Sequence, residues 1–165
     1  MLVGLAGIPS CRLYATLFKG KDMNKVYCCE CNKEVDAVLV SGMSIYTHRP
    51  ELWDKKFYQC PICLNHCRAG KFPDGYRPLA DIASPELRAE RQRLHDLFDH
   101  LWKINNDPKR SRAGWYKYMA CGLYGSAKKK FHFGNLHSFQ ECKRAEKMIR
   151  KIYKRLGLTF RKSLI

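Results

Sequence analysis

The sequence predicts an α+β protein in which a small cysteine-rich β module is joined to a basic, helical C-terminal part. Two cysteine pairs with the same internal spacing flank an apolar, hairpin-like stretch, and apolar side chains recur at helical spacing from about residue 85 onward. Lysine and arginine are concentrated after residue 100. A chain of 165 residues corresponds to one domain, or to one domain plus a small module, and it is long enough to bury a core.

The chain begins with "MLVGLAGIPSCRLYATLFKGKD". Gly4, Gly7 and Pro9 interrupt its apolar stretch, and no basic segment precedes that stretch, which argues against a signal peptide. Met23 opens "MNKVYCCEC" directly before the cysteine cluster, and we expect residues 1–25 to be an N-terminal extension. No apolar run approaches the roughly 18 residues of a membrane span. The expected location is the cytoplasm, with no membrane partner.

The nine cysteines are odd in number and clustered, which favours metal binding in a reducing compartment over a disulfide scaffold. Cys28 and Cys31 form one C-x2-C pair, and Cys60 and Cys63 form a second. This spacing lets two sulfurs of one tight turn occupy adjacent corners of a tetrahedron, while the second turn supplies the other two. We predict one structural Zn²⁺ held by these four sulfurs in a zinc-ribbon module over residues 26–70.

Between the pairs, "AVLVSGMSIY" indicates a β-hairpin with Gly42 at its turn. Asn32 and Asn65 follow the two pairs where a left-handed backbone is often needed, and asparagine tolerates that conformation. Only one residue, Glu30, separates Cys29 from Cys31, so this pair does not have the two-residue spacing of a knuckle. We expect Cys29 to lie outside the ligand set.

Three further side chains can replace a cysteine ligand: His48, His66 and Cys67. Four sulfurs already close a structural site, so the sequence favours no substitution. The roles of Cys29, His66 and Cys67 stay open. The remaining cysteines are explained as small core or surface residues, and they are Cys11, Cys121 and Cys142.

A Gly/Pro-rich connection is expected over residues 71–84, followed by a helical basic part over 85–157. Ser84 is a good N-cap and Pro85 suits the first helical position, which predicts a helix ending near residue 104. "NNDPKRS" breaks this helix, and Ser111 can cap a second one. Two separately folded parts, or one shared core, both remain open.

The second helix contains Trp115, Tyr118, Met119 and Leu123. Aromatic side chains of this kind stack on nucleic-acid bases in some proteins. They are more often part of a core, and we favour the core interpretation.

The last helix begins with a capping box, Ser138 followed by Glu141, and Gly157 ends it, which leaves residues 158–165 as a C-terminal tail. At about 100° per residue, five basic side chains share the face opposite the apolar stripe. They are Lys143, Lys147, Arg150, Lys151 and Lys154. We expect this face to contact phosphates, whereas the alternative is an ordinary solvated surface.

The charge distribution supports a polyanionic partner. Residues 101–165 contain 17 Lys or Arg and three acidic residues, so they carry +14 of the formal charge of +16. Each phosphate neutralised by such a surface releases condensed counterions, which favours binding of DNA or RNA. Charge that serves solubility alone is the alternative.

The chain also resembles a known family through its two C-x2-C pairs and three longer segments. These are "RPLADIASPELRAERQRLHDLFDHLWK" (77–103), "SRAGWYKYMACGL" (111–123) and "FHFGNLHSFQEC" (131–142). Across residues 26–155 it resembles the phage and prophage zinc-finger-containing domain family of unknown function. The resemblance implies a zinc finger joined to a small helical part, encoded by a phage. The family's His-containing run after the second pair is replaced here by "LNHCRAGKFPDGYRPLA", which weakens the case for a histidine ligand.

His132, Asn135 and His137 are similar to part of a His/Asn/His nuclease site. Only one residue separates Asn135 from His137, however, and a zinc closed by four sulfurs leaves no position for an activating water. We therefore expect no catalytic residues and no small-molecule substrate. The predicted function is phosphate-based nucleic-acid binding by a phage accessory protein. The alternative is an interaction factor whose basic surface binds an acidic surface of a partner protein, and which inhibits or redirects a host enzyme or defence complex in the host cytoplasm. A zinc-stabilised nuclease ranks third.

Overall fold

The computed structural model describes residues 24–103 and 108–160. Five strands form one antiparallel sheet in the order β1-β2-β3-β4-β5. The strands are β1 (Asn24–Cys28), β2 (Lys33–Ser41), β3 (Lys56–Gln59), β4 (His66–Phe72) and β5 (Gly75–Pro78). Since each strand pairs with its neighbour in the chain, every connection in the sheet is local.

The predicted hairpin turn at Gly42 is wrong. The chain leaves β2 into two short helical segments, α1 (Gly42–Ile45) and η2 (Pro50–Leu52), before β3 pairs with β2. The Gly42 amide donates to the Lys55 carbonyl at 2.7 Å, and a Cβ on Gly42 would lie 1.7 Å from the Leu52 carbonyl oxygen. The glycine therefore permits a close backbone approach at the base of this excursion, where no side chain would fit.

The expected connection over residues 71–84 differs from the structure in its first half. Residues 71–78 belong to a β4–β5 hairpin, in which Phe72 pairs with Gly75. The Gly/Pro-rich composition marks the tight turn of this hairpin, and Gly75 has the positive φ of +125° that such turns require. The sheet is consequently larger than a two-knuckle ribbon.

Three long helices make up the C-terminal part: α2 (Pro85–Lys103), α3 (Pro108–Tyr124) and α4 (Phe139–Arg155), with the short η3 (Phe133–Asn135) before the last. The Ser84 hydroxyl accepts from the Leu87 amide, and the Ser138 hydroxyl accepts from the Glu141 amide, both at 3.3 Å. Gly157 follows α4 with a φ of +67°. In contrast, α3 begins three residues before Ser111, because a proline suits a first helical position.

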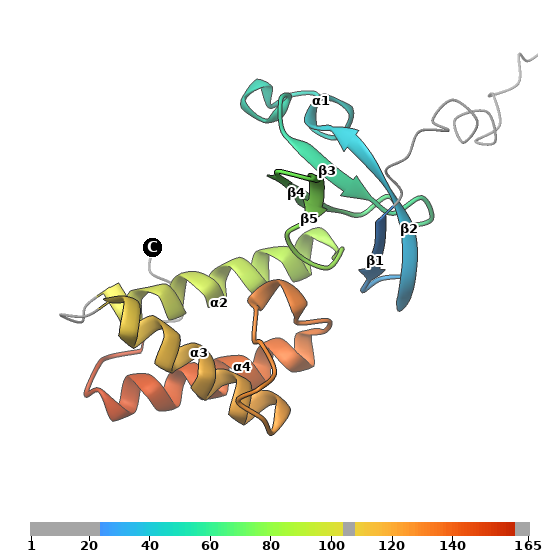
Figure 1. Cartoon of the computed structure of the whole chain (residues 1–165). Helices are drawn as coiled ribbons and strands as arrows, with labels where there is room; N and C mark the ends of the chain where they lie inside the picture. The colour runs from blue at the N-terminus through green and yellow to red at the C-terminus, as the bar shows by residue number, and fades with distance from the viewer. Residues whose placement is uncertain (1–23, 104–107, 161–165) are drawn as a thin grey trace, which may run out of the picture.

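The described residues form two hydrophobic clusters. One lies in the sheet and includes Val26, Val35 and Tyr58. The other joins the helices and includes Leu94, Phe98 and several α4 side chains. Helix α2 lies between the sheet and the other two long helices (Figure 1). The predicted α+β class, with a cysteine-rich β part and three long helices, is confirmed.

Within residues 24–103 and 108–160, no helix combines the length and apolar character that crossing a bilayer requires.

Candidate metal centre and basic helix face

Two turns bring the four predicted sulfurs together. Cys28 ends β1 and Cys31 lies in the turn before β2, whereas Cys60 follows β3 and Cys63 lies in the turn before β4. The β1–β2 and β3–β4 turns meet because β2 pairs with β3 in the same sheet. The structure therefore places two local C-x2-C turns at one end of the sheet.

The sulfur geometry fits a tetrahedral ion. The Cys28 and Cys63 Sγ atoms are 3.5 Å apart, the Cys31 and Cys60 Sγ atoms are 3.7 Å apart, and all four sulfurs lie within 4.8 Å of one another. A zinc ion bonded to each sulfur at about 2.3 Å would separate the sulfurs by about 3.8 Å. The Cys28–Cys63 and Cys31–Cys60 separations are close to this value, so the cluster has the size that a tetrahedral zinc site requires.

Both turns use the same backbone device. Asn32 follows Cys31 with a φ of 52°, and Leu64 follows Cys63 with a φ of 61°. The prediction for Asn32 is thus confirmed, but the left-handed residue of the second turn is Leu64 and not Asn65. A leucine in this conformation costs of order 1 kcal/mol. Residue type alone favoured asparagine at the second turn. Asn32 directly follows Cys31, and the residue that directly follows Cys63 is Leu64, so the position relative to the last cysteine of each pair would have identified it.

Cys29 faces away from the four-sulfur cluster. Its Sγ accepts a hydrogen bond from Arg91 Nη2 at 3.2 Å, and its amide donates to the Ile82 carbonyl at 2.8 Å. Burial raises the pKa of the Cys29 thiol, while Arg91 acts in the opposite direction. Cys29 therefore connects the zinc-binding turn to α2.

The other candidate ligands also lie outside the cluster. His66 is buried, its Nε2 lies 2.7 Å from the Tyr46 hydroxyl, and burial lowers its pKa to about 4. Cys67 is buried on the opposite face of β4, and burial raises its pKa to about 12. His48 is exposed in the loop after α1. Cys11 lies outside the described residues.

Comparison with known proteins agrees with this cluster. A family model described as a zinc-finger-containing domain matches residues 17–152. The chain belongs to this zinc-finger-containing domain family. No curated protein and no solved structure gives a significant match. The family and the four-sulfur cluster together support a structural zinc ion in this zinc-finger-containing domain.

The histidines of "FHFGNLH" make contacts within the fold. His132 Nδ1 accepts from the Gly134 amide at 3.1 Å and begins η3. His137 Nε2 lies 2.9 Å from Asp81 Oδ2, and the His137 ring stacks on Tyr27 with centroids 4.3 Å apart. These contacts hold the segment before α4 against the start of the sheet. Asn135 is exposed.

The five predicted phosphate-binding side chains are all exposed on α4. Their surroundings nevertheless differ. Arg150 donates to Glu146 Oε1 from both Nε and Nη2, at 3.0 and 2.6 Å, and its guanidinium lies 4.0 Å from the Phe160 ring centroid. Glu146 also binds Arg93 of α2 at 2.7 Å. Arg150 is therefore partly neutralised, and the Glu146–Arg150 spacing of four residues was a signal in the sequence.

Four lysines of α4 have no acidic partner among the described residues: Lys143, Lys147, Lys151 and Lys154. Two arginines missed by the sequence analysis continue the cationic surface on the side away from Arg150. Arg144 is exposed and lies 3.9 Å from Glu141, and Arg155 is exposed at the end of the helix. Their positions at helical spacing would have identified them.

Proposed function

We propose that this zinc-finger-containing domain binds nucleic acid mainly through phosphate contacts made by the exposed face of α4. The main support for this proposal is the row of four lysines without acidic partners among the described residues, on a helix whose opposite side is buried. Outer faces of ordinary helices mix charges of both signs, and such mixing neutralises the field that attracts a polyanion. Glu146, which lies between Lys143 and Lys147 in the sequence, is already paired with Arg93 and Arg150.

In this proposal the zinc has a structural role. We propose Cys28, Cys31, Cys60 and Cys63 as its ligands, since their sulfurs form a closed donor set. The ordered sheet contacts α2 through Cys29 and Arg91, and α2 packs against α4. Zinc thereby stabilises the part that holds α4 in place.

The biological setting is also part of the proposal. The resemblance to a phage and prophage family suggests a phage accessory protein acting on nucleic acid in the host cytoplasm. A protein partner with an acidic surface is the alternative, and the same basic row would serve it. The exposed Ile62 and Leu64 at the second cysteine turn favour that alternative, because an apolar tip suits a protein interface.

The test is the salt dependence of binding. If the four lysines each neutralise one phosphate, log K for duplex DNA falls with log salt with a slope of about −3.6. Changing Lys147 and Lys151 to Glu removes two contacts and brings the slope to roughly −1.8. Affinity should fall alike on unrelated sequences, because phosphate contacts do not read bases. Fluorescence anisotropy of labelled duplexes measures both quantities.

The matched control reverses two exposed lysines of the sheet module, Lys25 and Lys55. This variant has the same net charge as the α4 variant, so the comparison separates the effect of the α4 face on binding from the effect of net charge alone. Equal losses in the two variants would contradict α4 as the binding face. Absence of binding to any nucleic acid at low salt would favour the acidic protein partner.

A further inference from the structure

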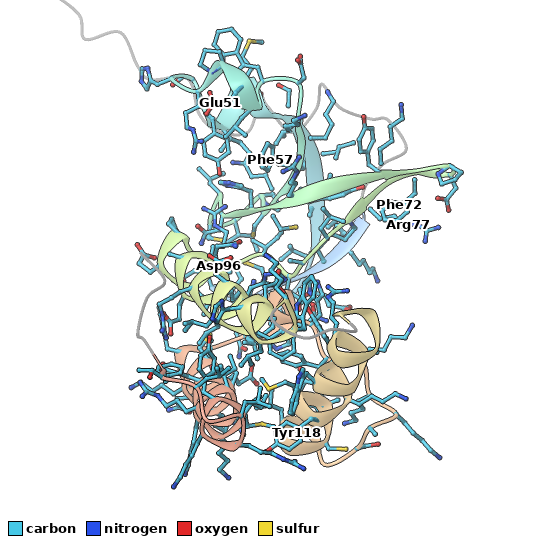
Figure 2. The ribbon with its side chains drawn as sticks, turned by 90° about the vertical axis from the view of Figure 1, so that its left-hand side faces the viewer. Glu51, Phe57, Phe72, Arg77, Asp96 and Tyr118 are labelled. Atoms are coloured by element: carbon cyan, nitrogen blue, oxygen red, sulfur yellow. The ribbon has the colours of Figure 1, made fainter. Side chains whose placement is uncertain are left out.

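A groove of about 410 Å³ lies between α3 and the end of α4. It is lined by Gly114, Trp115 and Tyr118 of α3 and by Arg155 of α4. Figure 2 labels Tyr118 at the end of the helical part that lies away from the sheet. The groove thus belongs to the helical, basic half of the molecule.

The walls of the groove suit a flat aromatic group. Trp115 and Tyr118 are three residues apart on one helix, their ring centroids are 6.0 Å apart, and their planes are at 89°. Both side chains are only partly buried, although they also pack against the helical core. Two perpendicular rings form a corner in which a third planar ring can stack on one and meet the other edge-on.

Gly114 keeps this corner open. A Cβ placed on Gly114 would meet no atom within 4 Å, so the glycine is not required by packing. In a helix interior glycine costs about 1 kcal/mol relative to alanine. A larger residue at position 114 would therefore stabilise the helix, but its side chain would occupy the space beside the two aromatic rings.

A basic side chain of α4 lies at the edge of the groove. Arg155 has no ion-pair partner among the described residues, and Lys151 lies one helical turn before it on α4. An aromatic ring in the corner would therefore have a cationic edge beside it for an attached phosphate. Stacking surfaces next to a positively charged track are the feature by which proteins hold single-stranded nucleic acid.

We propose that this groove receives an unpaired base of single-stranded nucleic acid, stacked on Trp115, with its phosphate at Arg155. The inference rests on the proposed function and names its substrate class, because a paired base inside a duplex cannot enter the corner. It predicts that a single strand binds more tightly than a duplex of equal charge.

The experiment compares a short labelled oligothymidine with a labelled duplex. Trp115→Leu should weaken binding of the single strand on the order of tenfold and leave duplex binding unchanged. Trp53→Leu, in the sheet module, is the matched control and should change neither. With Trp53 and Trp102 replaced by Phe, the remaining Trp115 fluorescence should be quenched by the single strand.

Gly114→Leu is a second variant that removes no core contact. It should retain the fold, fill the groove and weaken single-strand binding selectively, so the test stands even if Trp115→Leu fails to fold. Equal single-strand affinity of wild type and a folded Gly114→Leu protein would overturn the groove while leaving phosphate binding intact. Failure to bind either probe at low salt would instead remove the proposed function, and the groove proposal with it.

Discussion

Arg91 connects the metal-binding turn to the helices, and its replacement should loosen both. The side chain is 5% exposed on α2. Its guanidinium donates to the Leu136 carbonyl at 2.8 Å, to the Asp81 carbonyl at 2.9 Å and to Cys29 Sγ at 3.2 Å. One buried group thus joins the segment before α4, the segment before α2 and the first cysteine turn.

Methionine at position 91 would keep an apolar stem of similar length and remove all three donors. Each hydrogen bond from a charged donor contributes about 1.5–3 kcal/mol, and the two carbonyl bonds dominate because a thiol is a weak acceptor. Relief of the desolvation of a buried charge offsets part of this loss. We expect Arg91→Met to lower the free energy of unfolding by about 3 kcal/mol, which corresponds to a decrease in Tm of roughly 9 °C for a chain of this size.

Thermal unfolding of the zinc-loaded protein, followed by circular dichroism, measures this decrease. Arg144→Met is the control, since Arg144 is exposed and makes only a 3.9 Å ion pair; it should shift Tm by less than about 2 °C. Equal Tm values for Arg91→Met and wild type would refute the connecting role of Arg91. If the helices unfold at a lower temperature in Arg91→Met while the cysteine turn unfolds as in wild type, the contact between Arg91 and Cys29 does not contribute to stability.

Two other perturbations test local features. Because burial lowers the pKa of His66 to about 4, the unfolded chain binds its proton first, so stability falls as pH decreases from about 7 to about 5. His66 should account for a loss of about 2 kcal/mol in the free energy of unfolding. Urea titrations at both pH values should show this loss in wild type but not in His66→Gln. An identical loss in the two proteins would contradict the role of His66. Gly42→Ala should destabilise by about 2 kcal/mol, since the new Cβ would overlap the Leu52 carbonyl, whereas Gly114→Ala should stabilise slightly. The Tm of Gly42→Ala should therefore be lower than that of Gly114→Ala. An equal or higher Tm for Gly42→Ala would be inconsistent with the close approach at Gly42.

Features decided by a few neighbouring residues could be predicted from the sequence. The C-x2-C pairs, the capping serines of α2 and α4 and the glycine after α4 all act within one turn of chain, so their spacing carries the information. The basic face of α4 follows from helical spacing in the same way. The predicted α+β class rested on these local signals.

Features that depend on distant segments could not be predicted. The contact of Cys29 with Arg91 joins residues 62 positions apart, and nothing in either neighbourhood of the sequence indicates it. Gly42 looked like a turn residue because glycine serves both turns and close backbone approaches. The groove at Trp115 exists only because α4 ends beside α3, so composition alone favoured a simple core position.

We propose that one structural zinc is held by Cys28, Cys31, Cys60 and Cys63, and that Cys29 lies outside this ligand set. Metal analysis of purified protein tests it most directly. We predict one zinc per chain in wild type and in Cys29→Ser, and loss of zinc in Cys28→Ser, because a three-sulfur site binds zinc far more weakly. Zinc retained in full by Cys28→Ser and lost by Cys29→Ser would contradict the ligand set.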